Sequence, residues 1–575
     1  MLFSELCEAF SRIEETRSGN EMRSILAALL KKTPCDEVGI VCNLMEGQLA
    51  SPYEGIVVGF AEKMAVRAIA DAYGKDASSV GAAAKKKGDA GSAAEPLANA
   101  RKATLGLKEV FHVLNKLAGT IGGGSQESKI TILSKMLKSC TPLEAKYLVR
   151  FVCGQLRLGA GTMTVLDALA MAFLGGKDKR KELESAYNIC PDVGWIAETC
   201  ARRGLAGIKR IGVKPGRPIK MMLASRTDSI ASIKDRMDLI CAEEKYDGER
   251  MQAHFDGKRL TLFSRRLDVI TEQFPDVAQA LLKRLKAKSY VIEGECCAVD
   301  KAGNLEPFQK LMKRRRKHDV EEYSKSIPVT LFLFDLLYLN GKTYLNAPYL
   351  QRRNALASIV KISGPGKGRT ITLARNVVTS DIDKVEDFFN ESLERGCEGI
   401  IAKNAGAEGV YQAGSRGTLW IKWKREYSKE MQDTFDLVVV GAYLGRGKRA
   451  GKYGALLCAT YNDKTDQYET ICKLGSGFTD LELGRLEKRL GKYRARKKPN
   501  NVAAKSVEEP DVWFKPGQVC EVLGAELTRS PTHTCSELDG KGLAIRFPRL
   551  VRWRDDKNAE QATTSGEIEK MAKGR

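Results

Sequence analysis

The chain has few residues of the types that usually bind metals. It contains only four histidines (His112, His254, His318 and His533), and none of them is spaced as a metal-binding pair. Its fifteen cysteines are an odd number and include no Cys-x-x-Cys pair. This pattern suits neither a disulfide framework nor a structural zinc site, so we expect reduced thiols in an intracellular compartment. The scarcity of histidine also argues against zinc catalysis and histidine-dependent hydrolysis.

Long apolar stretches are also missing. No apolar run approaches the roughly 18 residues of a membrane span, so we predict no transmembrane segment. The first six residues, Met1 to Leu6, lack the basic start and apolar stretch of a signal peptide. We therefore expect a cytoplasmic protein.

Acidic residues are outnumbered by basic ones. There are 94 Lys and Arg against 72 Asp and Glu, which gives a formal net charge of +22. Such an excess indicates a polyanionic partner, with nucleic acid ahead of a membrane surface, although a merely solvated basic surface is the alternative. At 575 residues the chain is too long for one compact core, so we expect two to four domains.

The first part of the chain, residues 1–212, is predicted to be helical. Its apolar residues recur at three- and four-residue spacing. Thr141, followed by Pro142 and by Glu144 three positions on, predicts the start of a helix. Residues 74–102 are rich in Ala, Gly, Lys and Ser, and we expect them to form a mobile loop.

Two further patterns follow. Residues 213–427 alternate short β-like runs with helical stretches and predict a mixed α+β domain. The expected strands are 252–255, 260–264, 290–292 and 329–334, and the expected helices are 276–286 and 380–395. Residues 428–575 contain about five short strands linked by Gly-rich turns, which suggests a small β-barrel. Four of those strands are expected at 437–443, 456–461, 468–473 and 519–523, and the polar tail from residue 558 is expected to be frayed.

One lysine stands out chemically. Residues 243–250 read Glu-Glu-Lys-Tyr-Asp-Gly-Glu-Arg and place Lys245 in a K-x-D-G-x-R spacing. A lysine amine becomes a nucleophile only when desolvation or neighbouring cations lower its pKa. Glu243 and Arg250 flank Lys245 beside a tight Asp-Gly turn, which is the setting that attack on a phosphate ester requires. We therefore predict a covalent lysine–nucleotide intermediate, although this short motif alone occurs by chance in many proteins.

Two more lysines occupy alternate positions. Lys422 and Lys424 alternate with Ile421 and Trp423, so both lysines face one side of a strand. In a cleft, two adjacent lysines favour a phosphate between them. The alternative is an exposed edge that discourages strand pairing.

Other candidates stand at the ends of predicted strands. Glu295 and Glu398 offer carboxylates for a divalent cation. Arg250 and Arg265 would stabilise charge on a transferring phosphoryl group. Phe334 offers a flat face for a base, a contact worth about 1–3 kcal/mol. Taken singly, the acids are better read as solvated or salt-bridged and Phe334 as a core residue, but their ordered conjunction favours a site.

These residues resemble the motifs of ATP-dependent DNA ligases of the archaeal and eukaryotic replicative type. In chain order the motifs are EKYDGER, FSRR, EGE, FDLLYLNG, CEGIIAK, WIKWK and RWRDDK. The resemblance extends over nearly the whole chain. It implies an all-α DNA-binding domain at 1–212, an α+β nucleotidyltransferase (adenylation) domain at 213–427 and a β-barrel OB-fold domain at 428–575. One departure is Met221, which stands where the family often has proline.

The resemblance also implies roles for individual residues. Lys245 would be the adenylated nucleophile. Glu243 would contact the adenine, with Phe334 stacked on it, and Arg250 and Glu295 would lie near the ribose.

The remaining implied contacts concern phosphates and metal. Arg265 and Arg416 would lie near the nucleotide phosphate or the nick. Glu398, together with Glu295, would bind the metal. Lys422 and Lys424 would contact the α-phosphate. From the last motif, the residues that would close over ATP and orient its pyrophosphate are Arg554, Asp556 and Lys557.

The implied function is sealing of nicks in duplex DNA during replication, repair and recombination. ATP would donate AMP, and Mg²⁺ or Mn²⁺ would be the metal. The resemblance implies a monomer, associated with the nucleoid if the source is archaeal, and a sliding-clamp partner, although no Q-x-x-L-x-x-F-F segment is present. The alternatives are an RNA ligase or capping-type nucleotidyltransferase, which shares the lysine motif, and a non-catalytic nucleic-acid-binding protein.

Overall fold

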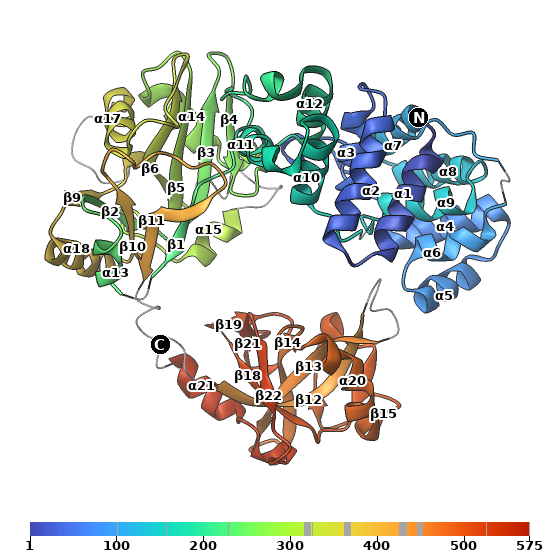
Figure 1. Ribbon diagram of the computed structural model, residues 1–575. Coiled ribbons are helices and arrows are strands. Elements are labelled where there is room, and N and C mark those ends of the chain that lie inside the picture. Colours follow the sequence, from blue (N-terminus) through green and yellow to red (C-terminus); the bar gives the residue numbers. More distant parts are fainter. Residues whose placement is uncertain are drawn as a thin grey trace. The chain divides into compact units, whose positions relative to one another are not determined.

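The chain divides into two compact units. The computed structural model describes all residues except 100–101, 157, 228, 315–321, 323, 325, 362–369, 425–433, 446–451, 525 and 574–575. The first unit comprises Met1–Met64 and Asn99–Ser428, and the second comprises Ala65–Ala98 and Lys429–Arg575. Figure 1 shows the helices and strands along the chain.

The N-terminal part of the first unit is helical, as predicted. Its helices are α1 (Phe3–Glu15), α2 (Gly19–Lys32), α3 (Val38–Met45), α7 (Leu107–Gly119), α8 (Ser125–Leu137), α9 (Pro142–Val152), α10 (Thr162–Phe173), α11 (Arg180–Ile189) and α12 (Val193–Ile208). The predicted start of α9 is confirmed. The Glu144 side chain accepts a hydrogen bond from the Thr141 backbone N–H at 2.8 Å, and Thr141 caps Glu144 in return.

The mobile loop expected within residues 74–102 is wrong for the described residues. Helix α4 (Glu62–Tyr73) is followed by α5 (Ala77–Lys87) and α6 (Ala90–Ala94). Asp76 and Asp89 precede these two helices, and each accepts a hydrogen bond from the backbone N–H three residues on, at 3.0 and 2.8 Å. Alanine is the best helix former and aspartate a good N-cap, so composition alone misled the expectation.

The central part of the first unit contains two sheets. The first sheet has the order β1-β11-β10-β2-β9, and the second has the order β4-β3-β5-β6-β7, with β8 beside β6. The strands of the first sheet are β1 (Leu223–Arg226), β2 (Ile240–Lys245), β9 (Asn376–Thr379), β10 (Gly399–Asn404) and β11 (Arg416–Lys424). Those of the second are β3 (Glu249–Phe255), β4 (Leu260–Ser264), β5 (Tyr290–Ala298), β6 (Val329–Leu339), β7 (Lys342–Thr343) and β8 (Ile371–Leu373). The four strands expected in this region are confirmed within β3, β4, β5 and β6.

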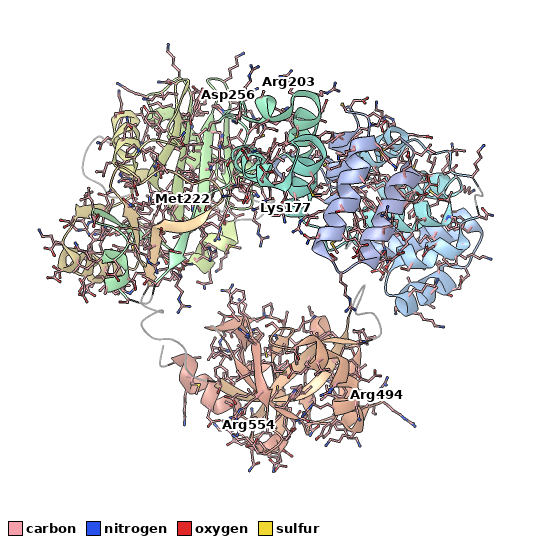
Figure 2. The ribbon with its side chains drawn as sticks, viewed as in Figure 1. Lys177, Arg203, Met222, Asp256, Arg494 and Arg554 are labelled. Atoms are coloured by element: carbon pink, nitrogen blue, oxygen red, sulfur yellow. The ribbon has the colours of Figure 1, made fainter. Side chains whose placement is uncertain are left out.

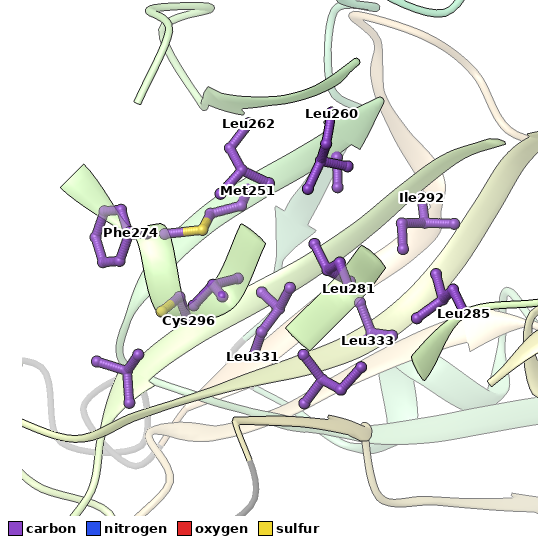
Figure 3. Close-up of a cluster of buried hydrophobic side chains, with 14 of the residues drawn as sticks. Met251, Leu260, Leu262, Phe274, Leu281, Leu285, Ile292, Cys296, Leu331 and Leu333 are labelled. Carbon is purple, nitrogen blue, oxygen red and sulfur yellow. The ribbon is translucent and has the colours of Figure 1, made fainter. Parts of the chain in front are cut away.

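Helices cover one face of each sheet. Helices α14 (Pro275–Arg284) and α17 (Tyr349–Ile359) pack on the second sheet, and α18 (Ile382–Glu394) packs on the first. The two helices expected in this region correspond to α14 and α18. Figure 3 shows the core beneath α14, in which Leu281 and Phe274 meet Met251, Ile292 and Leu333 from the sheet. Burying such side chains stabilises each by about 1.5–3 kcal/mol.

Another apolar cluster joins the two sheets. It includes Met222 beside the first sheet, Trp420 on β11 and Val291, Phe334 and Leu337 on the second sheet. The faces of the sheets that lie opposite their helices therefore meet, and polar side chains at this junction are enclosed on two sides.

The C-terminal part of the second unit is rich in strands, as predicted. One sheet has the order β15-β17-β12-β13-β14-β16, with β18 pairing β12 and β22, and a smaller sheet has the order β19-β21-β20. The strands are β12 (Thr434–Leu444), β13 (Tyr453–Asn462), β14 (Gln467–Leu474), β15 (Arg494–Ala495), β16 (Val502–Ala503), β17 (Val512–Phe514), β18 (Val519–Leu523), β19 (Glu526–Ser530), β20 (Cys535–Leu538), β21 (Lys541–Arg546) and β22 (Arg549–Trp553). All four expected strands fall within β12, β13, β14 and β18.

The tail expected to be frayed is folded through Lys573. A 3₁₀ turn (Ala559–Gln561) and helix α21 (Ser565–Lys573) follow β22. Ile568 is fully buried in the core of the C-terminal strands, and the Ser565 hydroxyl lies 2.9 Å from the Thr460 hydroxyl. The polar composition of the tail hid its few apolar positions, of which Ile568 is the most deeply buried.

Two further observations concern the whole described chain. All fifteen cysteines carry free thiols. Among the described residues, no helix is both long and apolar enough to span a membrane.

The anchoring of α21 can be tested by mutation. Ile568→Ala should lower the free energy of unfolding of the C-terminal strands by about 2–5 kcal/mol, because it opens a cavity in their core. Urea unfolding of the full chain would show a lower midpoint, and trypsin would cut the tail sooner. Lys570→Ala, on the exposed side of the same helix, should change neither. Equal behaviour of the two variants would contradict a packed tail.

Candidate active site

Eight of the predicted site residues surround one cavity. The cavity has a volume of about 560 Å³ and lies at the junction of the two sheets of the first unit. Its predicted lining residues are Glu243, Lys245, Arg250, Arg265, Glu295, Phe334, Arg416 and Lys422. Residues separated by up to about 180 positions in the chain are thus brought to one place, as a shared site requires.

Lys245 lies where the chain passes from one sheet to the other. It is the last residue of β2, and β3 begins in the second sheet at Glu249. The turn between them requires glycine at position 248. A Cβ atom there would lie 2.3 Å from the carbonyl oxygen of Cys296 on β5. This close packing holds the lysine at the floor of the cavity.

The Lys245 ammonium contacts the carboxylate of Glu398. The same carboxylate oxygen lies 2.8 Å from Nζ of Lys424. Glu398 is held in turn by its backbone N–H, which donates to the Lys245 carbonyl oxygen at 2.9 Å. Burial opposes ionisation of Glu398, but the two ammonium groups outweigh it and lower the pKa of this carboxyl. Glu398 is therefore an anion between two lysines.

Position 399 also requires glycine. Gly399 has φ +145°, and a Cβ atom there would lie 2.2 Å from the Trp423 carbonyl oxygen on β11. Because Gly399 has no side chain, β10 can approach β11 closely, and Glu398 lies beside Lys424. The period-two alternation predicted for β11 is confirmed, because Ile421 and Trp423 are buried whereas the two lysines are partly exposed.

Two further carboxylates interact with Glu398. Burial raises the pKa of Glu295 to about 7, against the opposing effect of Lys245 and Arg250, and Glu398 adds to the rise. The pKa of Asp247 is raised first by burial and then by Glu398. Partly desolvated carboxylates that repel one another are the donor type that a hard divalent cation prefers.

The carboxylates fit an ion only in part. Among the described residues, no group of three Asp, Glu, His or Cys side chains has the arrangement of a complete metal cage. Mg²⁺ commonly binds one or two carboxylates and completes its shell with water and substrate phosphates. Glu295 and Glu398 therefore suit a metal that arrives with a phosphate ligand.

An aromatic and cationic wall forms another side of the cavity. The Phe334 and Trp420 rings meet edge to face, with centroids 6.2 Å apart. Nζ of Lys403 lies 4.5 Å from the Phe334 centroid and 4.4 Å from that of Trp420. The guanidinium of Arg250 lies 5.3 Å from both centroids. A flat ring beside fixed cations is a surface on which a nucleobase can stack.

Glu243 lines the cavity but is already engaged. Its carboxylate contacts the Lys403 ammonium and the Tyr349 hydroxyl, and Arg353 lies 3.9 Å away. The side chain is nearly fully buried. These contacts fix its position, while the predicted adenine contact stays a prediction.

Arg250 is held by a carboxylate that the sequence did not single out. Its Nη2 donates to Glu293 at 2.8 Å, and its Nη1 donates to the carbonyl oxygen of Met222, labelled in Figure 2, at 2.7 Å. Glu293 is fully buried and also accepts from Gln252 and Tyr411, each at 3.0 Å. The burial of this carboxylate is compensated by its three donors.

Arg265 and Arg416 lie at the exposed rim of the cavity, whereas Lys422 is partly buried. An exposed guanidinium at a cavity rim is placed for a phosphate that extends out of the cavity. Both guanidinium groups are therefore accessible to a charged ligand from solvent.

Arg554 and Lys557 belong to the second unit. Arg554 donates two hydrogen bonds to Asp436 at 3.0 Å, and Nζ of Lys557 lies 2.7 Å from the same carboxylate. Arg554 (Figure 2) also pairs with Asp556 at 2.8 Å and lowers the pKa of that carboxyl to about 2. Their role at the nucleotide stays a prediction.

Sequence reasoning missed four residues. Glu293, Lys403 and Trp420 belong to motifs that were recognised, and their alternation with Glu295, Ile401 and Lys422 along the strands could have marked them. Asp436, the partner of Arg554, carried no such signal because it lies over a hundred residues away.

Family models match three consecutive parts of the chain. Residues 2–170 match the model described as DNA ligase N terminus, residues 221–424 the ATP dependent DNA ligase domain, and residues 449–557 the ATP dependent DNA ligase C terminal region. The central match contains the cavity and every residue that lines it.

Relatives match along nearly the whole length. DNA ligase 2 of Thermofilum pendens is 44% identical over 99% of this chain and 97% of its own. DNA ligase 1 of Methanosarcina acetivorans is 41% identical over 100% of this chain and 99% of its own. A solved structure titled Pmar-Lig_Pre. has a TM-score of 0.55 at 17% identity, covers 96% of this chain and 100% of that one, and shows a likeness of fold alone. On the matched models and these relatives, the chain belongs to the ATP-dependent DNA ligase family.

Proposed function

We propose that this enzyme seals nicks in duplex DNA through a covalent Lys245–AMP intermediate. The observation that carries the proposal is the cavity in which Lys245 meets a partly buried carboxylate, a second lysine and an aromatic wall. The family membership supports the same reaction. A simple hydrolase would need an activated water, whereas here the group at the cavity floor is an amine.

In the first step the Lys245 amine forms a bond to the α-phosphorus of ATP, and the bond from that phosphorus to the pyrophosphate oxygen breaks. The Lys245 ammonium gives its proton to water, and the free amine exchanges its contact with Glu398 for the phosphorus. Lys422 and Lys424 neutralise charge on the α-phosphate, and the Phe334 face orients the base. A divalent cation held by Glu398 and Glu295 would, when bound, neutralise the phosphates and the leaving group.

The next two steps act on DNA. AMP passes from Lys245 to the 5′-phosphate at the nick, and the 3′-hydroxyl then attacks that phosphate and releases AMP. Arg265 and Arg416, both exposed at the rim, would contact the phosphates of the strand. The net charge of +22 favours a duplex backbone, so binding should weaken steeply with salt.

The division of labour follows the predicted domains. Residues 1–212 would bind DNA, residues 213–427 would carry out adenylation, and residues 428–575 would act as the OB-fold domain. Arg554, Asp556 and Lys557 would orient the pyrophosphate. Action as a monomer in replication, repair and recombination, with a sliding clamp as partner, belongs to the same proposal and is supported by the family resemblance.

Covalent labelling tests the nucleophile. Incubation with [α-³²P]ATP and Mg²⁺ should leave the label on the wild-type chain after denaturing electrophoresis, and Lys245→Ala should abolish it because the amine that forms the bond is removed. Sealing of nicked DNA, nicked RNA and mixed duplexes should be compared in parallel. Labelling of Lys245→Ala would overturn the assignment, and preference for nicked RNA would favour an RNA ligase.

Neutralising Glu398 tests the metal site. Glu398→Gln keeps the shape but removes the charge, so self-adenylation should slow by about 10²-fold or more and need more Mg²⁺. Calorimetric titration of Mg²⁺ with bound ATP should show weaker binding independently of turnover. The control Glu386→Gln removes a carboxylate from the exposed side of α18 and should match wild type. Unchanged Mg²⁺ dependence in Glu398→Gln would exclude Glu398 as a ligand.

A further inference from the structure

Glu244 and Tyr246, which flank Lys245 in the sequence, are both held by hydrogen bonds. Strand alternation directs Glu243 and Lys245 to one face of β2 and Glu244 to the other. On that other face lies a second cavity of about 290 Å³, lined by Glu244, Tyr246, Arg375 and Arg395 among others. We call these four residues the rear anchor.

Glu244 is the centre of the rear anchor. It is only 4% exposed, and both of its carboxylate oxygens have partners. The Tyr246 hydroxyl donates to Oε2 at 2.7 Å, and Nε of Arg395 donates to Oε1 at 2.8 Å. Nη1 of Arg375 lies 3.5 Å from the same Oε1, and the Glu244 backbone N–H donates to the Arg375 carbonyl oxygen at 3.1 Å. Position 244 is therefore fixed through both its main chain and its side chain.

Tyr246 is fixed as firmly on the other side of Lys245. Its ring stacks on Phe332 with centroids 4.0 Å apart and planes 13° apart. Its hydroxyl accepts from the Arg375 backbone N–H at 3.2 Å. Burial and then Glu244 raise the pKa of Tyr246, so the phenol keeps the proton that it donates to Glu244.

The two arginines come from different elements. Arg395 is the C-cap residue of α18, and Arg375 precedes β9, so Glu244 joins β2 to both. Both guanidinium groups are well exposed, with side-chain exposures of 58% and 44%, whereas their shared partner is buried. Removing a buried carboxylate's exposed partner loosens that carboxylate without opening the core.

We propose that Glu244 is a positioning residue for Lys245. Its contacts with Tyr246 and Arg395 fix the main chain on which Lys245 stands. The inference rests on the proposed function. Glu244 also lines the cavity that contains Lys245, but its carboxylate is engaged by Tyr246 and Arg395, so it acts on Lys245 through them. It fixes the main chain on one side of Lys245 and, through Tyr246, on the other, so that the amine meets the α-phosphorus in line. Misplacement by about 1 Å costs on the order of 10²-fold in rate.

The role predicts an effect that depends on the reaction step. Lys245 forms a bond to phosphorus in the first step and breaks it in the second, whereas in the third step the 3′-hydroxyl attacks an adenylate already on the DNA. The rear anchor should therefore govern lysine adenylation and leave sealing of a pre-adenylated nick unaffected. Loss of general stability would slow both.

The test uses the full chain and three variants, Glu244→Gln, Arg395→Ala and Arg395→Lys. Single-turnover adenylation with labelled ATP should slow by about 10- to 100-fold in Glu244→Gln and Arg395→Ala, with the half-saturating ATP concentration unchanged. Arg395→Lys should recover part of the rate, because its ammonium keeps the positive charge. Sealing of a pre-adenylated nicked duplex should proceed at the wild-type rate in all three.

Lys384→Ala is the matched control. Lys384 is exposed on the same helix α18 and lies 3.9 Å from Asp381 in a surface ion pair, so both rates should stay at wild type. Equal slowing of both reactions in the variants, or no slowing of adenylation, would overturn the positioning role. A wild-type chain that neither takes up label nor seals nicked DNA would instead overturn the proposed function, and the positioning role with it.

Discussion

The site depends on the crossing of the chain from one sheet to the other directly after Lys245. Tyr246, Asp247 and Gly248 are the only residues between β2 and β3, and the crossing is possible because Gly248 presents no side chain to β5. The sheets are thereby held close enough for a carboxylate on β5 and a lysine on β11 to reach the same space. The K-x-D-G spacing is thus a structural requirement as well as a chemical one, since the lysine and the glycine serve the same crossing.

Buried charge around this crossing is compensated at each position by specific partners. Glu293 pairs with Arg250, and Glu243 pairs with Lys403. Asp335 accepts two hydrogen bonds from Arg352, at 2.8 and 3.0 Å. Such pairs contribute little net stability, because desolvation cancels most of the attraction, but breaking one is costly. Their effect is to fix geometry. Asp335 follows Phe334 on β6, so its pairing with α17 also holds the strand that presents the Phe334 ring.

Much of the fold and of the site could be predicted from the sequence, and the failures have physical causes. Strands and motif residues were found because alternation and spacing are local signals. Residues 74–102 were misjudged because an alanine-rich composition resembles a linker until its aspartate caps are considered. The partners Glu293 and Asp436 could not be assigned, since which acid meets which arginine is decided by the pairing of distant strands. The local sequence shows which residues are charged, but only the tertiary fold determines which of them form pairs.

The contact between Lys245 and Glu398 couples the binding of a nucleotide to the binding of a metal. In the free enzyme one carboxylate holds two ammonium groups, which keeps the nucleophile in place but engaged. A phosphate that enters beside Lys422 and Lys424 competes for the lysines, while a cation competes for the carboxylate. A phosphate alone would leave the carboxylate of Glu398 without its lysine partners, and a cation alone would leave the lysines without their carboxylate. When both bind, every charged group has a partner again. Nucleotide and metal are therefore expected to bind as a unit, and the amine is released only when the atom that it attacks has arrived.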